Sequence, residues 1–223
     1  MRAILLDIEG TTTPISFVYD VLFPFARKHL NAYLPSTDLT DLKQEYDEDV
    51  RKGLQPPSWA EGPVRYVEWL MDQDRKSTAL KKLQGEIWRA GYEKGELHGE
   101  IFPDVPPALE RWRRQKIDVR IFSSGSILAQ RLIFSTTRAG DLTRFLRGYF
   151  DTTTGPKNEA SSYQQIANEF GLAAGDIVFV SDVTRELDAA RSAGMKALLC
   201  VRPGNHPQPT HTHTTITTFD GLN

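Results

Sequence analysis

The sequence has little cysteine, no excess of charge and no long apolar run. Its 223 residues include a single cysteine, Cys200, which excludes a disulfide framework and suits a reducing compartment. Lysine and arginine total 27 against 29 aspartate and glutamate, whereas binding to a nucleic-acid backbone needs a strong basic excess. No apolar run approaches the roughly 20 residues that span a bilayer, and the first one meets an acid at Asp7, which makes it too short for a signal peptide. We therefore expect a cytoplasmic protein that binds neither nucleic acid nor membrane.

What the sequence does contain is an alternation of short apolar runs with helical patterns. The apolar runs, which we interpret as strands, are residues 3–8, 117–122, 148–151, 176–181 and 196–201. The helical patterns between them are residues 126–135, 158–171 and 184–194. Strands that alternate with helices at this spacing predict an α/β fold with a doubly wound, mainly parallel, Rossmann-like sheet.

Two segments depart from this alternation. Residues 15–100 show helical spacing and no convincing strand, with expected helices at 17–34, 38–53, 59–73 and 77–93. We predict that 1–14 and 101–223 form one discontinuous α/β catalytic core, and that 15–100 form an all-helical cap inserted after the first strand. Residues 203–223 are rich in Pro, Thr and His. We predict a mobile tail around His206, His211 and His213 rather than a metal site, with an edge strand at 216–219.

The residues with the most reactive side chains follow the predicted strands, or lie in the loop that leads to one. They are Asp7 and Glu9 after the first strand, Ser123 and Ser124 after the second, Lys157 before the helix that leads to the fourth, and Asp182 after the fourth. Because parallel strands end at one edge of a sheet, we expect these side chains to converge there.

Together these residue types suit phosphoryl transfer. A carboxylate such as Asp7 can form an aspartyl-phosphate, and the oxygens of Asp7 and Asp182 suit Mg²⁺. Ser123 would hold phosphoryl oxygens, Lys157 would balance negative charge, and Glu9 would exchange a proton with the leaving oxygen and with water. Each residue alone also has an ordinary explanation, as a helix cap or a solvated loop side chain.

The combination resembles the haloacid dehalogenase superfamily of phosphotransferases. Its four motifs correspond here to ILLDIEGTT (4–12), IFSSGS (121–126), Lys157 and VFVSDVTREL (178–187). The resemblance implies a central first strand, a cap inserted after the first motif, Asp7 as nucleophile and Asp182 as a Mg²⁺ ligand. It also implies that the residue at the position of Glu9, usually Asp in the superfamily, binds Mg²⁺ through its backbone carbonyl.

A narrower resemblance, to the enolase-phosphatases of methionine salvage, covers residues 1 to about 205. It is carried by DIEGTTTPISFV (7–18), GYEKGELHGEIFPDV (91–105), IFSSGSILAQ (121–130), GPKNEASSY (155–163) and SDVTRELDAARSAGM (181–195). It implies Mg²⁺-dependent conversion of a phosphorylated diketone, 2,3-diketo-5-methylthiopentyl-1-phosphate, through an enol phosphate to acireductone. Ser123, Ser124 and Lys157 would contact the substrate, and Asp7, Glu9 and Asp182 would surround the metal. With the polar surface, it also favours a monomer.

Three alternatives stay open on the sequence. The base that removes the proton for enolisation is Glu9 or a cap residue such as Glu93, Lys94 or Glu96. The same core motifs would serve a plain phosphatase or mutase acting on another small phosphate ester. A catalytically silent binding protein is a third possibility, which the complete set of site residues disfavours.

Overall fold

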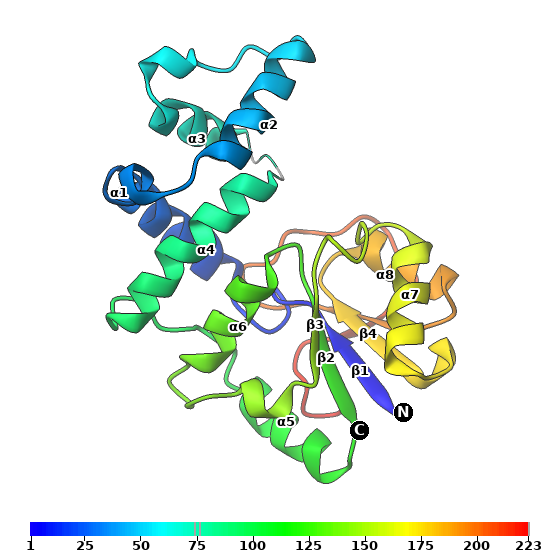
Figure 1. Cartoon of the computed structure of the whole chain (residues 1–223). Coiled ribbons are helices and arrows are strands. Elements are labelled where there is room, and N and C mark those ends of the chain that lie inside the picture. The colour runs from blue at the N-terminus through cyan, green and yellow to red at the C-terminus, as the bar shows by residue number, and fades with distance from the viewer. Residues whose placement is uncertain (74, 76, 223) are drawn as a thin grey trace. The chain divides into compact units, whose positions relative to one another are not determined.

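The computed structural model describes residues 1–73, 75 and 77–222. They form two compact units, Met1–Val18 with His98–Asn223, and Tyr19–Leu97. The first unit holds the sheet and the second is helical (Figure 1). In the described part of the second unit there is no strand.

The sheet has six strands in the order β3-β2-β1-β4-β5-β6, and every neighbouring pair is parallel. The strands are β1 (Ala3–Leu6), β2 (Asp118–Phe122), β3 (Gly148–Phe150), β4 (Ile177–Ser181), β5 (Lys196–Cys200) and β6 (Thr214–Ile216). The predicted doubly wound sheet is confirmed. Its order reverses beside β1, and ligands bind at such a switch point, beyond the carboxyl ends of the strands.

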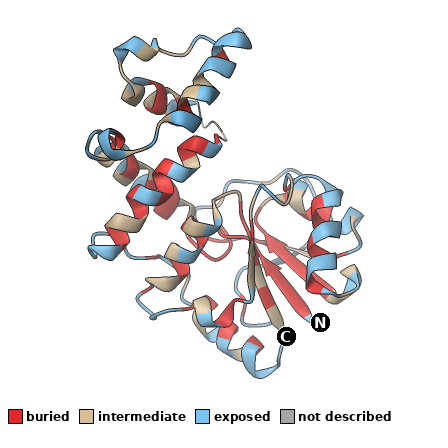
Figure 2. Ribbon diagram, viewed as in Figure 1, coloured by how far each residue is buried: buried red, intermediate tan, exposed pale blue. Residues whose placement is uncertain are grey.

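Burial on both faces explains why the central strands are continuous apolar runs. All residues of β1 and β4 are buried, because helices cover both sides of a parallel sheet. The helices of this unit are α5 (Val105–Arg114), α6 (Ile127–Ser135), α7 (Ala160–Phe170) and α8 (Thr184–Ser192), with the 3₁₀ turns η4 (Thr143–Phe145) and η5 (Ala174–Asp176). Figures 1 and 2 show α7 and α8 on one side of the sheet and α5 and α6 on the other, with their buried faces toward it.

The helical unit combines α-helices with short π-helical and 3₁₀ turns. Its elements are the π-helical turn η1 (Phe17–Leu22), where the chain leaves the first unit, and then α1 (Phe23–Tyr33), η2 (Leu34–Ser36), α2 (Thr40–Arg51), η3 (Trp59–Glu61), α3 (Pro63–Asp72) and α4 (Thr78–Glu93). Each predicted helix has a counterpart, but 17–34 and 59–73 are divided. The second division falls at Gly62, whose φ of +105° interrupts the helix.

The prediction of a mobile C-terminal tail is wrong for the residues that the structure describes. β6 pairs with β5, with Leu198 opposite Thr214, and forms the edge of the sheet. It begins two residues before the expected edge strand. Phe219 is fully buried, His213 is 7% exposed, and the His213 imidazole contacts Asp188 at 2.9 Å. The residues that hold this segment, in β5 and at Asp188, lie earlier in the chain, so the polar composition of the segment does not predict these contacts. None of the described helices has the length and apolar character needed to cross a membrane.

Candidate active site

Asp7 is held at the carboxyl end of β1 by a tight loop. Its backbone N–H donates to the Val180 carbonyl at the end of β4, and its Oδ1 accepts from the Ile8 N–H at 2.8 Å. The chain then turns through Gly10, whose φ is +68°. A Cβ at Gly10 would lie 2.3 Å from Asp182 Oδ2, so only glycine fits both the backbone angle and the space. The loop therefore brings the strand-end carboxylates of Asp7 and Asp182 near one another.

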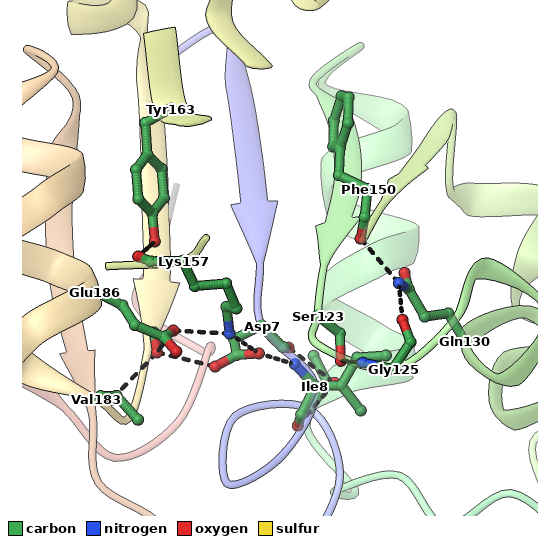
Figure 3. A network of polar contacts seen from close by, with 12 residues as sticks. Asp7, Ile8, Ser123, Gly125, Gln130, Phe150, Lys157, Tyr163, Val183 and Glu186 are labelled. Carbon is green, nitrogen blue, oxygen red and sulfur yellow. Dashed lines mark hydrogen bonds and ion pairs between the residues drawn. The ribbon is translucent and has the colours of Figure 1, made fainter. Parts of the chain in front are cut away.

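Lys157 is the buried cation of this site. Its Nζ lies 2.7 Å from Asp7 Oδ1 and 2.7 Å from Glu186 Oε2 (Figure 3). The Tyr163 hydroxyl, on α7, donates to the Lys157 carbonyl at 2.7 Å and so fixes the loop that carries the lysine. Burial alone would lower the pKa of Lys157, but the charges of Asp7 and Glu186 outweigh it and raise that pKa above its ordinary value. The ammonium is therefore charged across the physiological range.

Ser181 connects the two acids that flank the lysine. Its Oγ lies 2.9 Å from Asp7 Oδ2 and 3.0 Å from Glu186 Oε2, and it accepts from the Val183 N–H. A hydroxyl carries one hydrogen, so it donates to only one of the two carboxylates at a time. Burial first, and then the charge of Asp7, raise the pKa of Glu186 to about 7 against the opposing effect of Lys157. A proton on Glu186 satisfies both contacts of Ser181.

Asp182 follows β4 and is buried, with 6% of its surface exposed. Burial and the charge of Asp7 raise the pKa of Asp182 to about 8, although Lys157 lowers it. Two buried carboxylates that repel one another are the donors a hard divalent cation prefers, and Mg²⁺ commonly takes one or two carboxylates together with substrate phosphate and water. Among the described residues no three His, Cys, Asp or Glu side chains cluster as a metal site. A cation here would therefore rely on ligands beyond these side chains.

Ser123 and Ser124 follow β2 at the same sheet edge. Ser123 is 4% exposed and its Oγ accepts from the Gly125 N–H, whereas Ser124 is half-buried. The Gln130 side chain, on α6, fixes this loop by donating to the carbonyls of Gly125 and Phe150 at 2.9 and 2.8 Å (Figure 3). The result is a hydrogen-bonded turn that carries hydroxyl groups and backbone N–H groups, which suit an anion.

The structure brings some of the predicted site residues into one cluster and not others. Asp7, Lys157 and Asp182 form one electrostatic cluster, joined by Glu186. Glu9 is half-buried, and its backbone forms a bridge with Thr13 within the loop after β1. The alternative bases are exposed residues of the helical unit; they are Glu93, Lys94 and Glu96.

Three residues that support the site lie outside the predicted set, Glu186, Ser181 and Gln130. Ser181 immediately precedes Asp182, so its position at the end of a buried strand was a usable signal. A glutamine on an amphipathic helix gives no such signal, because most are solvated side chains. Its role depends on contacts between β3 and the Ser123 loop that only the folded chain creates.

Comparison with known proteins identifies the family to which the chain belongs. A family model of haloacid dehalogenase-like hydrolases matches residues 1–194. The UTR4 protein of Saccharomyces cerevisiae has a similar structure, with a TM-score of 0.81 and 33% identity over 99% of both chains. The chain belongs to the haloacid dehalogenase-like hydrolases.

Relatives with higher sequence identity identify a subgroup within these hydrolases. The enolase-phosphatase E1 of Synechococcus elongatus is 48% identical, over all of this chain and 98% of the relative. A grapevine (Vitis vinifera) protein named "Probable bifunctional methylthioribulose-1-phosphate dehydratase/enolase-phosphatase E1 1" is 46% identical over 99% of this chain and 47% of its own length. Within the hydrolases, the chain therefore falls in the enolase-phosphatase E1 family.

Proposed function

We propose that this enzyme converts 2,3-diketo-5-methylthiopentyl-1-phosphate, through an enol phosphate, to acireductone and inorganic phosphate, with Mg²⁺ as cofactor. The observation that carries the proposal is the buried carboxylate of Asp7, held 2.7 Å from the Lys157 ammonium in a chain that matches enolase-phosphatases along its length. The expected monomeric state, the cytoplasmic location and the role of residues 15–100 as a cap remain predictions from the sequence.

The grapevine relative supports the choice of substrate. Its name pairs the enolase-phosphatase with a methylthioribulose-1-phosphate dehydratase in one chain. Loss of water from the 3,4-diol of a methylthioribulose phosphate leaves a 2,3-diketone that still carries the phosphate ester. That product is the substrate we propose here.

The proposed cation site consists of the carboxylates of Asp7 and Asp182 and the backbone carbonyl of Glu9. A bound Mg²⁺ would offset the repulsion between Asp7 and an anionic ester and stabilise charge on the transferring phosphoryl group. Ser123 and Ser124 would hold phosphoryl oxygens through hydroxyl and backbone N–H groups. Lys157 contributes a fixed positive charge next to the nucleophile.

In the proposed phosphatase step, a carboxylate oxygen of Asp7 attacks phosphorus and the bond from phosphorus to the ester oxygen breaks. Glu9 gives its proton to the departing enol oxygen. A water molecule then attacks the aspartyl-phosphate, Glu9 takes its proton, and Asp7 is regenerated with release of phosphate. Enolisation comes first, and removes a proton from the carbon that bears the ester. Its base is Glu9 or one of the helical-unit residues Glu93, Lys94 and Glu96.

Replacing Glu9 with Gln tests the acid–base role. We expect phosphate release to slow on the order of 10²- to 10⁴-fold, the contribution of a positioned acid–base group, while Mg²⁺ affinity measured by calorimetry stays nearly unchanged, because a backbone carbonyl survives the substitution. Loss of Mg²⁺ binding in Glu9→Gln would instead show that the Glu9 carboxylate itself is a metal ligand. Glu159→Gln serves as a matched control, since Glu159 lies in the loop that carries Lys157 and is exposed.

The experiment that tests the function presents wild-type enzyme and Mg²⁺ with the diketone phosphate and with unrelated sugar phosphates. We expect an ultraviolet change from enol formation that precedes phosphate release, and little hydrolysis of the other esters. Rapid hydrolysis of the unrelated esters without enol absorbance would favour the alternative, a plain phosphatase. Interconversion of sugar phosphates without net phosphate release would favour a mutase.

A further inference from the structure

The segment that follows β5 contacts loops of the proposed active site. Arg202, 5% exposed, donates to the Thr11 carbonyl through Nε and forms a two-pronged ion pair with Asp104 at 2.9 and 2.8 Å. Gln208 accepts a hydrogen bond from the Thr184 N–H at the start of α8. The segment therefore contacts both the loop after β1 and the helix that carries Glu186.

Asn205, between these two anchors, contacts the loop next to Glu9. Its Nδ2 donates to the Gly10 carbonyl at 2.9 Å and to the Cys200 carbonyl at 3.1 Å. Both partners are acceptors, so the amide nitrogen must face them and the orientation of the amide is settled. The Oδ1 atom consequently points the other way.

Oδ1 of Asn205 is a buried acceptor without a hydrogen bond to any described residue. It approaches the same side of Gly10 as Asp182 Oδ2 does, at 2.9 and 2.3 Å from the position of a Cβ on that glycine. A buried acceptor left unpaired costs about 1–3 kcal/mol, and a neighbouring carboxylate adds repulsion. A donor or cation between the two oxygens would remove both penalties.

We propose that Asn205 is a positioning residue of the cation site, whose Nδ2 fixes the Gly10 loop and whose Oδ1 faces the cation or its bound water beside Asp182. The inference rests on the proposed Mg²⁺ site and extends it to a segment outside the four sequence motifs. Residues of this kind, which orient ligands without being among the principal donors, typically change metal affinity 10- to 100-fold when replaced.

The test measures the rise in melting temperature on adding Mg²⁺ to the full chain without substrate, for two variants and a control. Asn205→Leu removes donor and acceptor, and we expect about tenfold or greater loss of Mg²⁺ affinity and a smaller rise. Asn205→Asp places a third carboxylate beside the cation, so we expect lower stability in EDTA and a larger rise than in wild type. His206→Ala, in the same segment and exposed, should match wild type.

A purely structural role gives a different pattern. Both Asn205 variants would then lose stability equally with and without Mg²⁺, the rise would equal that of wild type, and the inference would be overturned. Failure of both variants to fold even in Mg²⁺ would also overturn it, whereas an Asn205→Asp chain that folds only with Mg²⁺ supports it. If wild type itself shows no rise, the proposed Mg²⁺ site fails as well, so the two failures are distinguishable.

Discussion

Asp7→Asn is expected to abolish phosphate release while leaving enol formation intact. A carboxamide is not a nucleophile toward phosphorus, so the rate of phosphate release should fall on the order of 10⁴-fold or more, as when a catalytic nucleophile is removed. In the proposed mechanism Lys157 and Ser123 would still hold the phosphate ester, and enolisation needs no attack by residue 7. The variant should therefore convert the diketone phosphate to a stable enol phosphate, followed by ultraviolet absorbance and by phosphate assay on the same sample.

The folded state should tolerate this substitution. The amide is isosteric with the carboxylate, its Oδ1 can accept from Lys157 and from the Ile8 N–H, and the repulsion of Asp182 disappears. Asp151→Asn is the matched control, because Asp151 follows β3 at the same sheet edge but its side chain, among the contacts described, bonds only to the neighbouring Thr153. Phosphate release within tenfold of wild type, with the Asn confirmed by mass spectrometry, would exclude Asp7 as the nucleophile.

Lys157→Met should have the largest effect on stability. The ammonium is 8% exposed and pairs at 2.7 Å with both Asp7 and Glu186. Removing one partner of a buried ion pair leaves uncompensated charge and costs about 3–5 kcal/mol. We expect the free energy of unfolding in EDTA to fall by that amount near pH 8, and phosphate release to fall about 10²- to 10³-fold, as for loss of a preorganised charge donor.

This loss of stability should depend on pH. In wild type the pKa values of Glu186 and Asp182 are already raised, to about 7 and about 8, and Lys157 opposes both shifts. Without the lysine they rise further, so the folded state binds more protons than the unfolded state from about pH 4 upward. The free energy of unfolding then decreases as pH rises through that window. Denaturant titrations in EDTA should accordingly show the variant closest to wild type near pH 5 and furthest from it at pH 8 and above.

Lys196→Met is the control for loss of a positive charge alone, since Lys196 is exposed at the start of β5. It should leave the free energy of unfolding within about 0.5 kcal/mol of wild type, as is usual for surface substitutions. A Lys157→Met chain whose stability is independent of pH between 5 and 8 would contradict the description of a buried, coupled cluster. Added Mg²⁺ should recover part of the lost stability, because a cation among the carboxylates replaces some of the missing charge.

Local sequence patterns were enough to locate strands β1 to β5 and the residues that follow them. The run from Ala3 to Leu6 is apolar because both faces of a central parallel strand are covered, and the acid that follows it therefore marks the sheet edge. The same argument located Ser123 and Asp182. The sequence indicated only the solvated end of a helix at residues 111–116, although Val105, Ala108, Leu109 and Trp112 are buried at helical spacing in α5. Pro106 and Pro107 lie in the first turn of this helix, where proline is tolerated.

The single cysteine and the near balance of charge do not indicate where in the fold charged side chains cluster. The sequence by itself determined the fold class, most of the strands and the residues that follow them, because these depend on short-range periodicity and on the geometry of parallel sheets. Only the tertiary structure decided that Lys157 pairs with both Asp7 and Glu186, that Ser181 joins them, and that a polar segment containing Arg202 and Asn205 supports the Gly10 loop. Those contacts join residues far apart in the chain, and burial, which gives them their strength, exists only once the chain has folded.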